Sequence, residues 1–165
     1  MSASNPQVLA TRQFPALDET QLVAWIQQIT NSFSDGAVVY LAGDLGAGKT
    51  TTARALIQSL GHRGRVKSPT YSLFELYELP GLTVAHLDLY RLADAAEVLD
   101  LGLEELGSDQ ACLLLVEWSE KGGDYLAKPD LCWQLTVNGE QRALEIRALS
   151  TKGAAIMAAW PSDLA

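Results

Sequence analysis

The segment Gly43-Asp-Leu-Gly46-Ala-Gly48-Lys49-Thr50 decides the fold of this chain of 165 residues. Its two outer glycines stand five positions apart, directly before a lysine and a threonine, which is the pattern of a P-loop, or Walker A motif. Glycine permits positive φ angles and carries no side chain, so consecutive backbone N–H groups can curl around a phosphate. The pattern therefore predicts a phosphate-binding loop in which Lys49 reaches the β- and γ-phosphates and the Thr50 hydroxyl binds Mg²⁺.

The residues on either side of this loop have the character that such a loop requires. Ala37 to Ala42 is a short apolar, β-branched run, typical of a buried parallel strand. Thr50 to Leu60 is predicted to be a helix that ends at Gly61, and the positive N-terminal end of that helix would attract an anion. An ordinary glycine-rich turn is the alternative. The order of strand, loop and helix favours the phosphate loop.

The remaining pattern predicts a single P-loop domain over residues 1–165, of the α/β class. Its sheet is expected to be parallel at the centre, with an antiparallel edge hairpin, and to be flanked by helices. Asp18 and Gln21 suggest a capping box for the first helix. The predicted helices and strands are Glu19 to Phe33, Tyr71 to Tyr77, Thr83 to Leu87, an acidic helical stretch from Asp94 to Leu106 with a break at Gly102, Ala111 to Trp118, a hairpin of Leu131 to Val137 and Arg142 to Ala148, and Lys152 to Ala159.

Composition restricts the class of protein. The chain is 48% hydrophobic, yet no apolar run approaches the roughly 18 residues of a membrane span, and Met1 to Gln13 does not resemble a secretory signal. Cys112 and Cys132 have no metal-type spacing, so we interpret them as reduced core thiols of a cytoplasmic protein. The net charge of −8 is the opposite of the charge of an autonomous nucleic-acid binder. If RNA is involved, we expect another protein to hold it.

Two carboxylates occupy positions where the Mg²⁺ site of a P-loop protein is expected. Glu117 ends the apolar run Leu113 to Val116, and Asp88 follows Val84 to Leu87. Ligands of open α/β sheets bind at the carboxyl edge of the strands. We therefore expect Glu117 to bind Mg²⁺ directly or through water, and Asp88 to position the metal or a water molecule. The alternative for both residues is that they cap the turn that follows.

Three nearby features each have two interpretations. Arg91 either reaches a phosphate or pairs with Asp88, and we expect the pair. His86 lies in an apolar strand, which is more typical of a core histidine than of a catalytic one. Ser68-Pro69-Thr70 either turns two hydroxyls toward a γ-phosphate or forms an ordinary turn.

Taken together, four motifs between about Val38 and Trp118, roughly half the chain, resemble the bacterial TsaE (YjeE) family. They occur in that family's order and at compatible spacing: Gly43-Asp-Leu-Gly-Ala-Gly-Lys-Thr-Thr51, Lys67-Ser-Pro-Thr-Tyr71, His86-Leu-Asp-Leu-Tyr-Arg-Leu92 and Val116-Glu-Trp118. TsaE proteins are small ATPases needed for the threonylcarbamoyladenosine modification of tRNA.

The resemblance implies roles for particular residues. Glu117 and Thr50 would hold Mg²⁺, Asp88 would be the second acidic residue that matters for hydrolysis, and Lys49 would act in catalysis with both carboxylates. Glu19, within Asp18 to Thr20, would contact the adenine side of ATP. The phosphates would be bound by Gly43, Gly46, Ala47, Gly48, Lys49, Thr50 and Thr51.

The resemblance also implies partners. Proteins similar to this one hydrolyse ATP slowly alone and act with TsaD and TsaB, which hold the tRNA and transfer the threonylcarbamoyl group to the adenosine at position 37. The ATP cycle would then reset or regulate that complex, and the contact with tRNA would be indirect. Such an arrangement agrees with the acidic charge of the chain.

Three competing functions remain. A small-molecule P-loop kinase generally has an arginine-bearing lid, but only Arg142 and Arg147 lie beyond Arg91, both in the predicted hairpin. A GTPase would need an Asn-Lys-x-Asp-type segment, which we do not find. In a nucleotide-dependent interaction module, ATP would only order a docking surface, a reading that overlaps with that of a slow ATPase.

Overall fold

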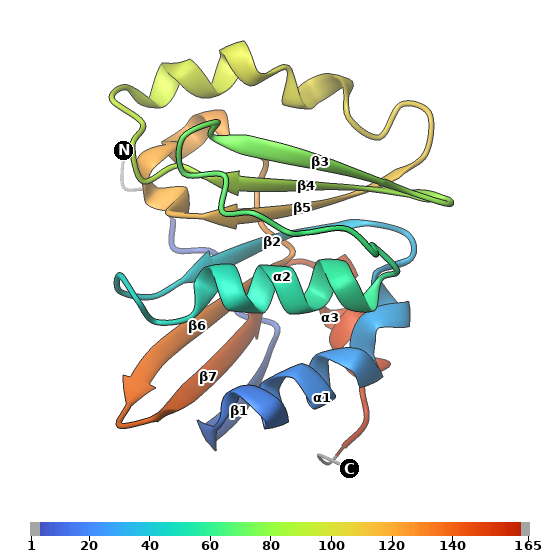
Figure 1. The fold of residues 1–165 in the computed structure, drawn as a ribbon, viewed down its shortest axis with the longest axis vertical. Coiled ribbons are helices and arrows are strands. Elements are labelled where there is room, and N and C mark those ends of the chain that lie inside the picture. The colour runs from blue at the N-terminus through green and yellow to red at the C-terminus, as the bar shows by residue number, and fades with distance from the viewer. Residues whose placement is uncertain (1–3, 163–165) are drawn as a thin grey trace.

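A seven-stranded sheet runs through the protein in the order β1-β7-β6-β2-β5-β4-β3 (Figure 1). The computed structural model describes residues 4–162, so the ends of the predicted domain, 1–3 and 163–165, lie outside the described residues. The strands are β1 (Ala10–Leu17), β2 (Ala37–Ala42), β3 (Phe74–Leu79), β4 (Leu82–Asp88), β5 (Ala111–Glu117), β6 (Leu131–Asn138) and β7 (Gln141–Ala148).

The centre of the sheet is parallel, as predicted. Strands β6, β2, β5 and β4 run in one direction, and antiparallel pairs flank them on both sides. The pairing places Glu117 beside Asp88 on one side and beside Leu41 on the other. The ends of three parallel strands therefore meet at one edge, directly before and beside the predicted phosphate loop.

The predicted β6–β7 hairpin forms, but it is not the edge of the sheet. Strand β1 pairs with β7 from Ala10 opposite Ala148 to Leu17 opposite Arg142. Strand β1 was not predicted because Pro15 weakens a strand assignment, and the structure shows its residues alternating between half-buried and exposed. Both features are acceptable in an edge strand, and the register of β1 shifts between Phe14 and Leu17.

The helices predicted before the sheet, after the loop and at the C-terminus all form. Two of them lie within one residue of their predicted ends, and the last turn of the first is a 3₁₀ helix instead of an α-helix. Helix α1 (Glu19–Ile29) begins with the predicted capping box, in which Gln21 N donates to Asp18 Oδ1 at 2.7 Å, and it continues as the 3₁₀ turn η1 (Thr30–Phe33). Helices α2 (Lys49–Ser59) and α3 (Thr151–Ala158) follow the prediction closely. Within residues 4–162, no helix is long and apolar enough to cross a bilayer.

The acidic segment is helical with a break at Gly102, as predicted, but its helices are of the 3₁₀ type. They are η2 (Ala95–Leu101) and η3 (Leu103–Glu105), separated by Gly102 at φ 67°. A residue at positive φ interrupts the helical hydrogen bonds, so the segment follows the surface in short turns. Strand β3 also begins three residues later than predicted, after Leu73 at φ 66°. Two further 3₁₀ turns, η4 (Ser119–Lys121) and η5 (Gly123–Tyr125), follow β5.

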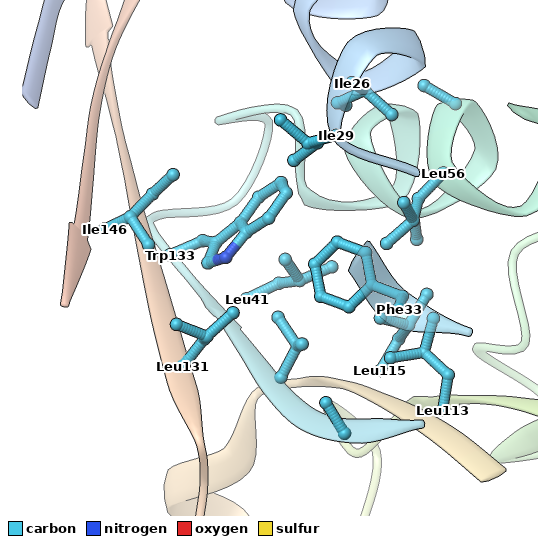
Figure 2. Packing of buried hydrophobic residues seen from close by; sticks show 14 of the residues in the cluster. Ile26, Ile29, Phe33, Leu41, Leu56, Leu113, Leu115, Leu131, Trp133 and Ile146 are labelled. Atoms are coloured by element: carbon cyan, nitrogen blue, oxygen red, sulfur yellow. The ribbon is translucent and has the colours of Figure 1, made fainter. Parts of the chain in front are cut away.

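Hydrophobic clusters cover both faces of the sheet. The larger one packs α1, α2 and α3 against the sheet, and Figure 2 shows Trp133 and Phe33 lying between strands and helices. The smaller one lies on the other face, where η2 and η3 pack against β4 and β5. Because alternate residues of a strand point to opposite faces, Val84 joins the first cluster and Ala85 the second. His86, Asp88 and Glu117 consequently share the face that α2 covers.

Candidate functional site

The predicted phosphate loop connects β2 to α2 and adopts a backbone that requires glycine. Gly43 has φ 147°, and a Cβ atom added there would lie 2.6 Å from the carbonyl oxygen of Leu135. Gly46 has φ 80°, but a Cβ atom there would meet nothing within 4 Å. In the part of the chain that the structure describes, no side chain caps the N-terminus of α2, which starts after Gly48, so its N–H groups are available to an anion.

A cleft of about 380 Å³ opens over this loop. Residues 45–51 form one wall, and the cleft is also lined by residues from the ends of β4 and β5 and from the segment before β3. Those residues are Ser68, Thr70, Asp88, Tyr90, Arg91, Glu117 and Trp118. The structure thus brings together the loop, both predicted carboxylates and the Ser68-Pro69-Thr70 segment, which are far apart in sequence.

Lys49 lies at the floor of the cleft and is only 5% exposed. Its Nζ atom donates to the carbonyl oxygen of Gly43 and, at 3.1 Å, to that of Asp44, and it lies 3.9 Å from the centre of the Trp118 ring. Burial lowers the pKa of Lys49 from its ordinary value, and the charge of Glu117 opposes that shift. A partly desolvated ammonium group interacts strongly with an anion that enters the cleft.

Thr50 and Glu117, the two residues predicted to hold Mg²⁺, are in direct contact. The Thr50 hydroxyl lies 2.9 Å from Oε1 and 3.1 Å from Oε2 of Glu117, and Glu117 is 2% exposed. A hydroxyl and a carboxylate are the hard oxygen ligands that Mg²⁺ prefers. No group of three or more His, Cys, Asp or Glu side chains suited to a metal occurs among residues 4–162. These two residues fit Mg²⁺ that is held partly by phosphate oxygens.

Asp88 belongs to a second hydrogen-bonded group at the same edge. Its Oδ2 accepts from the Thr70 hydroxyl at 3.0 Å, its Oδ1 accepts from Tyr90 N at 3.1 Å, and the Ser68 hydroxyl lies 2.6 Å from that of Thr70. Within residues 4–162, no ion pair joins Asp88 to Arg91, so the prediction of that pair is wrong. The guanidinium of Arg91 lies instead 4.5 Å from the centre of the Tyr71 ring, which leaves its charge at the cleft.

A smaller hollow of about 100 Å³ adjoins the loop on its other side. Glu19, the predicted adenine-side residue, lines it together with Gly48, Thr51 and Arg142. The Nε atom of Arg142 donates to the carbonyl oxygen of Ala47 at 2.9 Å, which ties β7 to the loop. Glu19 therefore lies beside the loop, and its contact with the adenine side of ATP stays a prediction.

A family model described as "Threonylcarbamoyl adenosine biosynthesis protein TsaE" matches residues 16–147, a range that contains both the cleft and the smaller hollow. The chain belongs to the TsaE family. The family identified from the four motifs is thereby confirmed, and the name of the family connects it with threonylcarbamoyladenosine biosynthesis.

Individual relatives agree with the TsaE assignment. The chain is 44% identical over 124 residues to "tRNA threonylcarbamoyladenosine biosynthesis protein TsaE" of Haemophilus influenzae, covering 74% of this chain and 77% of that one. It is 36% identical over 128 residues to the Rickettsia felis protein of the same name, covering 77% and 72%. A crystal structure of Bacillus subtilis YdiB has a TM-score of 0.73 and 25% identity, covering 93% of this chain and 95% of YdiB.

Sequence analysis missed three contributors to the site of this TsaE-family chain. Trp118 was quoted only as part of a motif, yet its ring lies under Lys49 and 5.0 Å from that of Tyr90. Arg142 was noted only as a hairpin residue. His86 was interpreted as a core histidine; it is fully buried, but its Nε2 atom lies 2.6 Å from Oε2 of Glu117. Alternation along β4 gives a signal for His86, since His86 and Asp88 point to the same face.

Proposed function

We propose that this TsaE-family chain binds and hydrolyses ATP with Mg²⁺, as the nucleotide-dependent component of the machinery that forms N6-threonylcarbamoyladenosine at position 37 of tRNA. It would act on a complex of the TsaD and TsaB type, which holds the tRNA, in the cytoplasm. The observation that carries the proposal is the contact of Thr50 with Glu117 at the end of the phosphate loop. Family membership supplies the pathway.

The residues of the cleft divide into three roles under this proposal. The loop backbone from Gly46 to Thr51, with Gly43 before it, would surround the phosphates, and Lys49 would supply the positive charge. Thr50 and Glu117 would hold Mg²⁺, which neutralises charge on the β- and γ-phosphates when it is bound. Asp88, held by Thr70 and Tyr90 N, would orient the attacking water.

The side chain of Lys49 already extends back over the phosphate loop. Its Nζ atom now donates to the carbonyl oxygens of Gly43 and Asp44, and a phosphate oxygen would replace them as a partner of higher charge. Glu19 and Arg142 would bound the nucleobase side, since both line the smaller hollow beside Gly48.

The test is phosphate release from ATP by the purified protein, alone and then with TsaD, TsaB and tRNA. Lys49→Ala and Glu117→Ala are expected to abolish stimulation by the complex. Lys128→Ala removes a lysine that is exposed and does not line the cleft, so it serves as the matched control and should keep stimulation. Failure of the complex to stimulate hydrolysis would refute the proposal. Phosphate transferred to a small metabolite would indicate the P-loop kinase.

A second measurement separates hydrolysis from nucleotide-dependent docking. If ATP only orders a docking surface, Lys49→Ala should lose partner binding in proportion to nucleotide affinity, and Glu117→Ala should still support tRNA modification. If hydrolysis matters, Glu117→Ala should dock in the presence of ATP yet block modification.

A further inference from the structure

We infer that His86 is a positioning residue for Mg²⁺ binding: its Nε2–H group holds the Glu117 carboxylate in place beside Thr50. The inference rests on the proposed function and deepens it, because it assigns a role to a buried side chain that the roles above leave unused.

The geometry of the three side chains carries the inference. His86 has no exposed surface, and its Nε2 atom lies 2.6 Å from Oε2 of Glu117. The same carboxylate contacts the Thr50 hydroxyl. His86 and Asp88 lie two positions apart on β4, so their side chains point to the same face of the sheet. The strand that brings Asp88 to the cleft therefore also brings the imidazole of His86 to Glu117.

The position of the proton follows from what each atom can do. An ionised carboxylate oxygen only accepts hydrogen bonds, so Nε2 of His86 must be the donor to Glu117. Nδ1 of His86 is buried and has no hydrogen-bond partner within residues 4–162. A proton on Nδ1 would be a buried donor without an acceptor, which is costly. The neutral imidazole with its proton on Nε2 satisfies both conditions.

This bond differs from the one that Thr50 makes. The Thr50 hydroxyl has one proton, placed between two oxygens of Glu117, and the same hydroxyl is a predicted metal ligand. Within residues 4–162, the His86 side chain makes no other polar contact and is not a predicted metal ligand, so its bond to Oε2 is not given up when Mg²⁺ binds. Of the two side chains that bond to Glu117, His86 is therefore the one that can orient the carboxylate whether or not metal is bound.

A purely structural role would have a different consequence. If His86 only fills the core, its replacement changes the stability of the protein and leaves the Mg²⁺ dependence of nucleotide binding unchanged. If it orients a ligand of the metal, replacement weakens Mg²⁺ binding by about 10- to 100-fold, as is usual for hydrogen-bond partners of metal ligands. Nucleotide binding without Mg²⁺ then stays the same.

The variants His86→Gln and His86→Asn distinguish a structural role of His86 from a role in orienting Glu117, because they differ only in how far the same amide group reaches. Both carry the same amide, but the glutamine amide extends about as far as Nε2 of histidine, and asparagine is one methylene shorter. Affinity for the fluorescent nucleotide mant-ATP is measured in EDTA and over a series of free Mg²⁺ concentrations, and the melting temperature of each variant is recorded.

We expect His86→Asn to need about 10- to 100-fold more Mg²⁺ for half of the metal-dependent gain in affinity, and His86→Gln to stay within a few-fold of wild type. Affinities in EDTA should agree. Equal Mg²⁺ midpoints for wild type and His86→Asn would overturn the inference, as would an equal loss of affinity in EDTA.

Two controls complete the design. His62→Gln changes a histidine that packs against Tyr77 and does not line the cleft, and it should keep the wild-type Mg²⁺ midpoint. His86→Leu fills the site without a donor and should behave like His86→Asn, which gives the comparison if His86→Asn does not fold. Wild-type protein that binds mant-ATP without any Mg²⁺ dependence would instead refute the proposed function.

Discussion

Replacing Gly43 and Gly46 by alanine, one at a time, should separate the folding of the phosphate loop from its binding of nucleotide. Both glycines have positive φ, so alanine costs about 1–2 kcal/mol at either position. Only at Gly43 does the new Cβ atom also meet backbone, 2.6 Å from the carbonyl oxygen of Leu135, and overpacking adds about 1–3 kcal/mol.

These terms give different melting temperatures. Gly43→Ala should lose about 2–5 kcal/mol, and Gly46→Ala about 1–2 kcal/mol. At roughly 2–4 °C per kcal/mol for a chain of this size, the melting temperature should fall by about 10 °C for Gly43→Ala and by about 5 °C for Gly46→Ala. The Cβ atom of Gly46→Ala extends into open space at a residue that lines the cleft, so this variant should bind mant-ATP at least about tenfold more weakly, which is about 1.4 kcal/mol.

The assay is thermal denaturation followed by circular dichroism, together with mant-ATP titration at a temperature where both variants are folded. Two results would refute the reasoning. One is a lower melting temperature for Gly46→Ala than for Gly43→Ala, and the other is wild-type nucleotide affinity in Gly46→Ala.

Three further predictions concern helix packing, alkaline pH and the loop lysine. Gly153→Ala should lower the melting temperature, because the new Cβ atom would lie 2.0 Å from the carbonyl oxygen of Asp130. This clash should outweigh the gain of about 1 kcal/mol in helix propensity that alanine brings. A variant that melts above wild type would contradict the prediction. Burial raises the pKa of Tyr40 from 10.0 to about 12, so its contribution to stability is complete below pH 10 and lost as the pH rises toward 12. In urea denaturation over that range, Tyr40→Phe should lose stability less steeply than wild type, and parallel curves would contradict the assignment. Burial lowers the pKa of Lys49, so folding disfavours its charged form. The nucleotide-free wild type should therefore gain stability relative to Lys49→Met as the pH rises toward 10.5, and Lys49→Met should abolish mant-ATP binding. A stability difference between the two proteins that does not change with pH would contradict the role given to burial.

Local sequence signals predicted the parallel centre of the sheet and the loop that it positions. The glycine pattern from Gly43 to Gly48 needs only its neighbouring strand and helix to be recognised, and the apolar run ending at Glu117 is typical of a buried strand. The position of Glu117 beside Asp88 then follows from the parallel pairing of β4 and β5.

The features that could not be predicted depend on contacts between distant segments. Strand β1 is stabilised by β7, which lies far along the chain, and nothing within its own eight residues marks it as a strand. The contact of Arg142 on β7 with the carbonyl oxygen of Ala47 in the loop likewise joins segments that are far apart in the sequence. Arg91 was expected to pair with the nearest carboxylate, but the exposed ring of Tyr71 offered a partner that spacing alone does not reveal.

The hollow beside Glu19 has a consequence for protein synthesis. Glu19 lies two residues after the end of β1, whose strand partner is β7, and Arg142 on β7 lines the same hollow. While a ribosome is still making β7, a nascent chain already contains the whole phosphate loop and Glu19 but not Arg142. If both residues contact the nucleobase as proposed, discrimination among nucleotides would begin only in chains whose synthesis has passed β7.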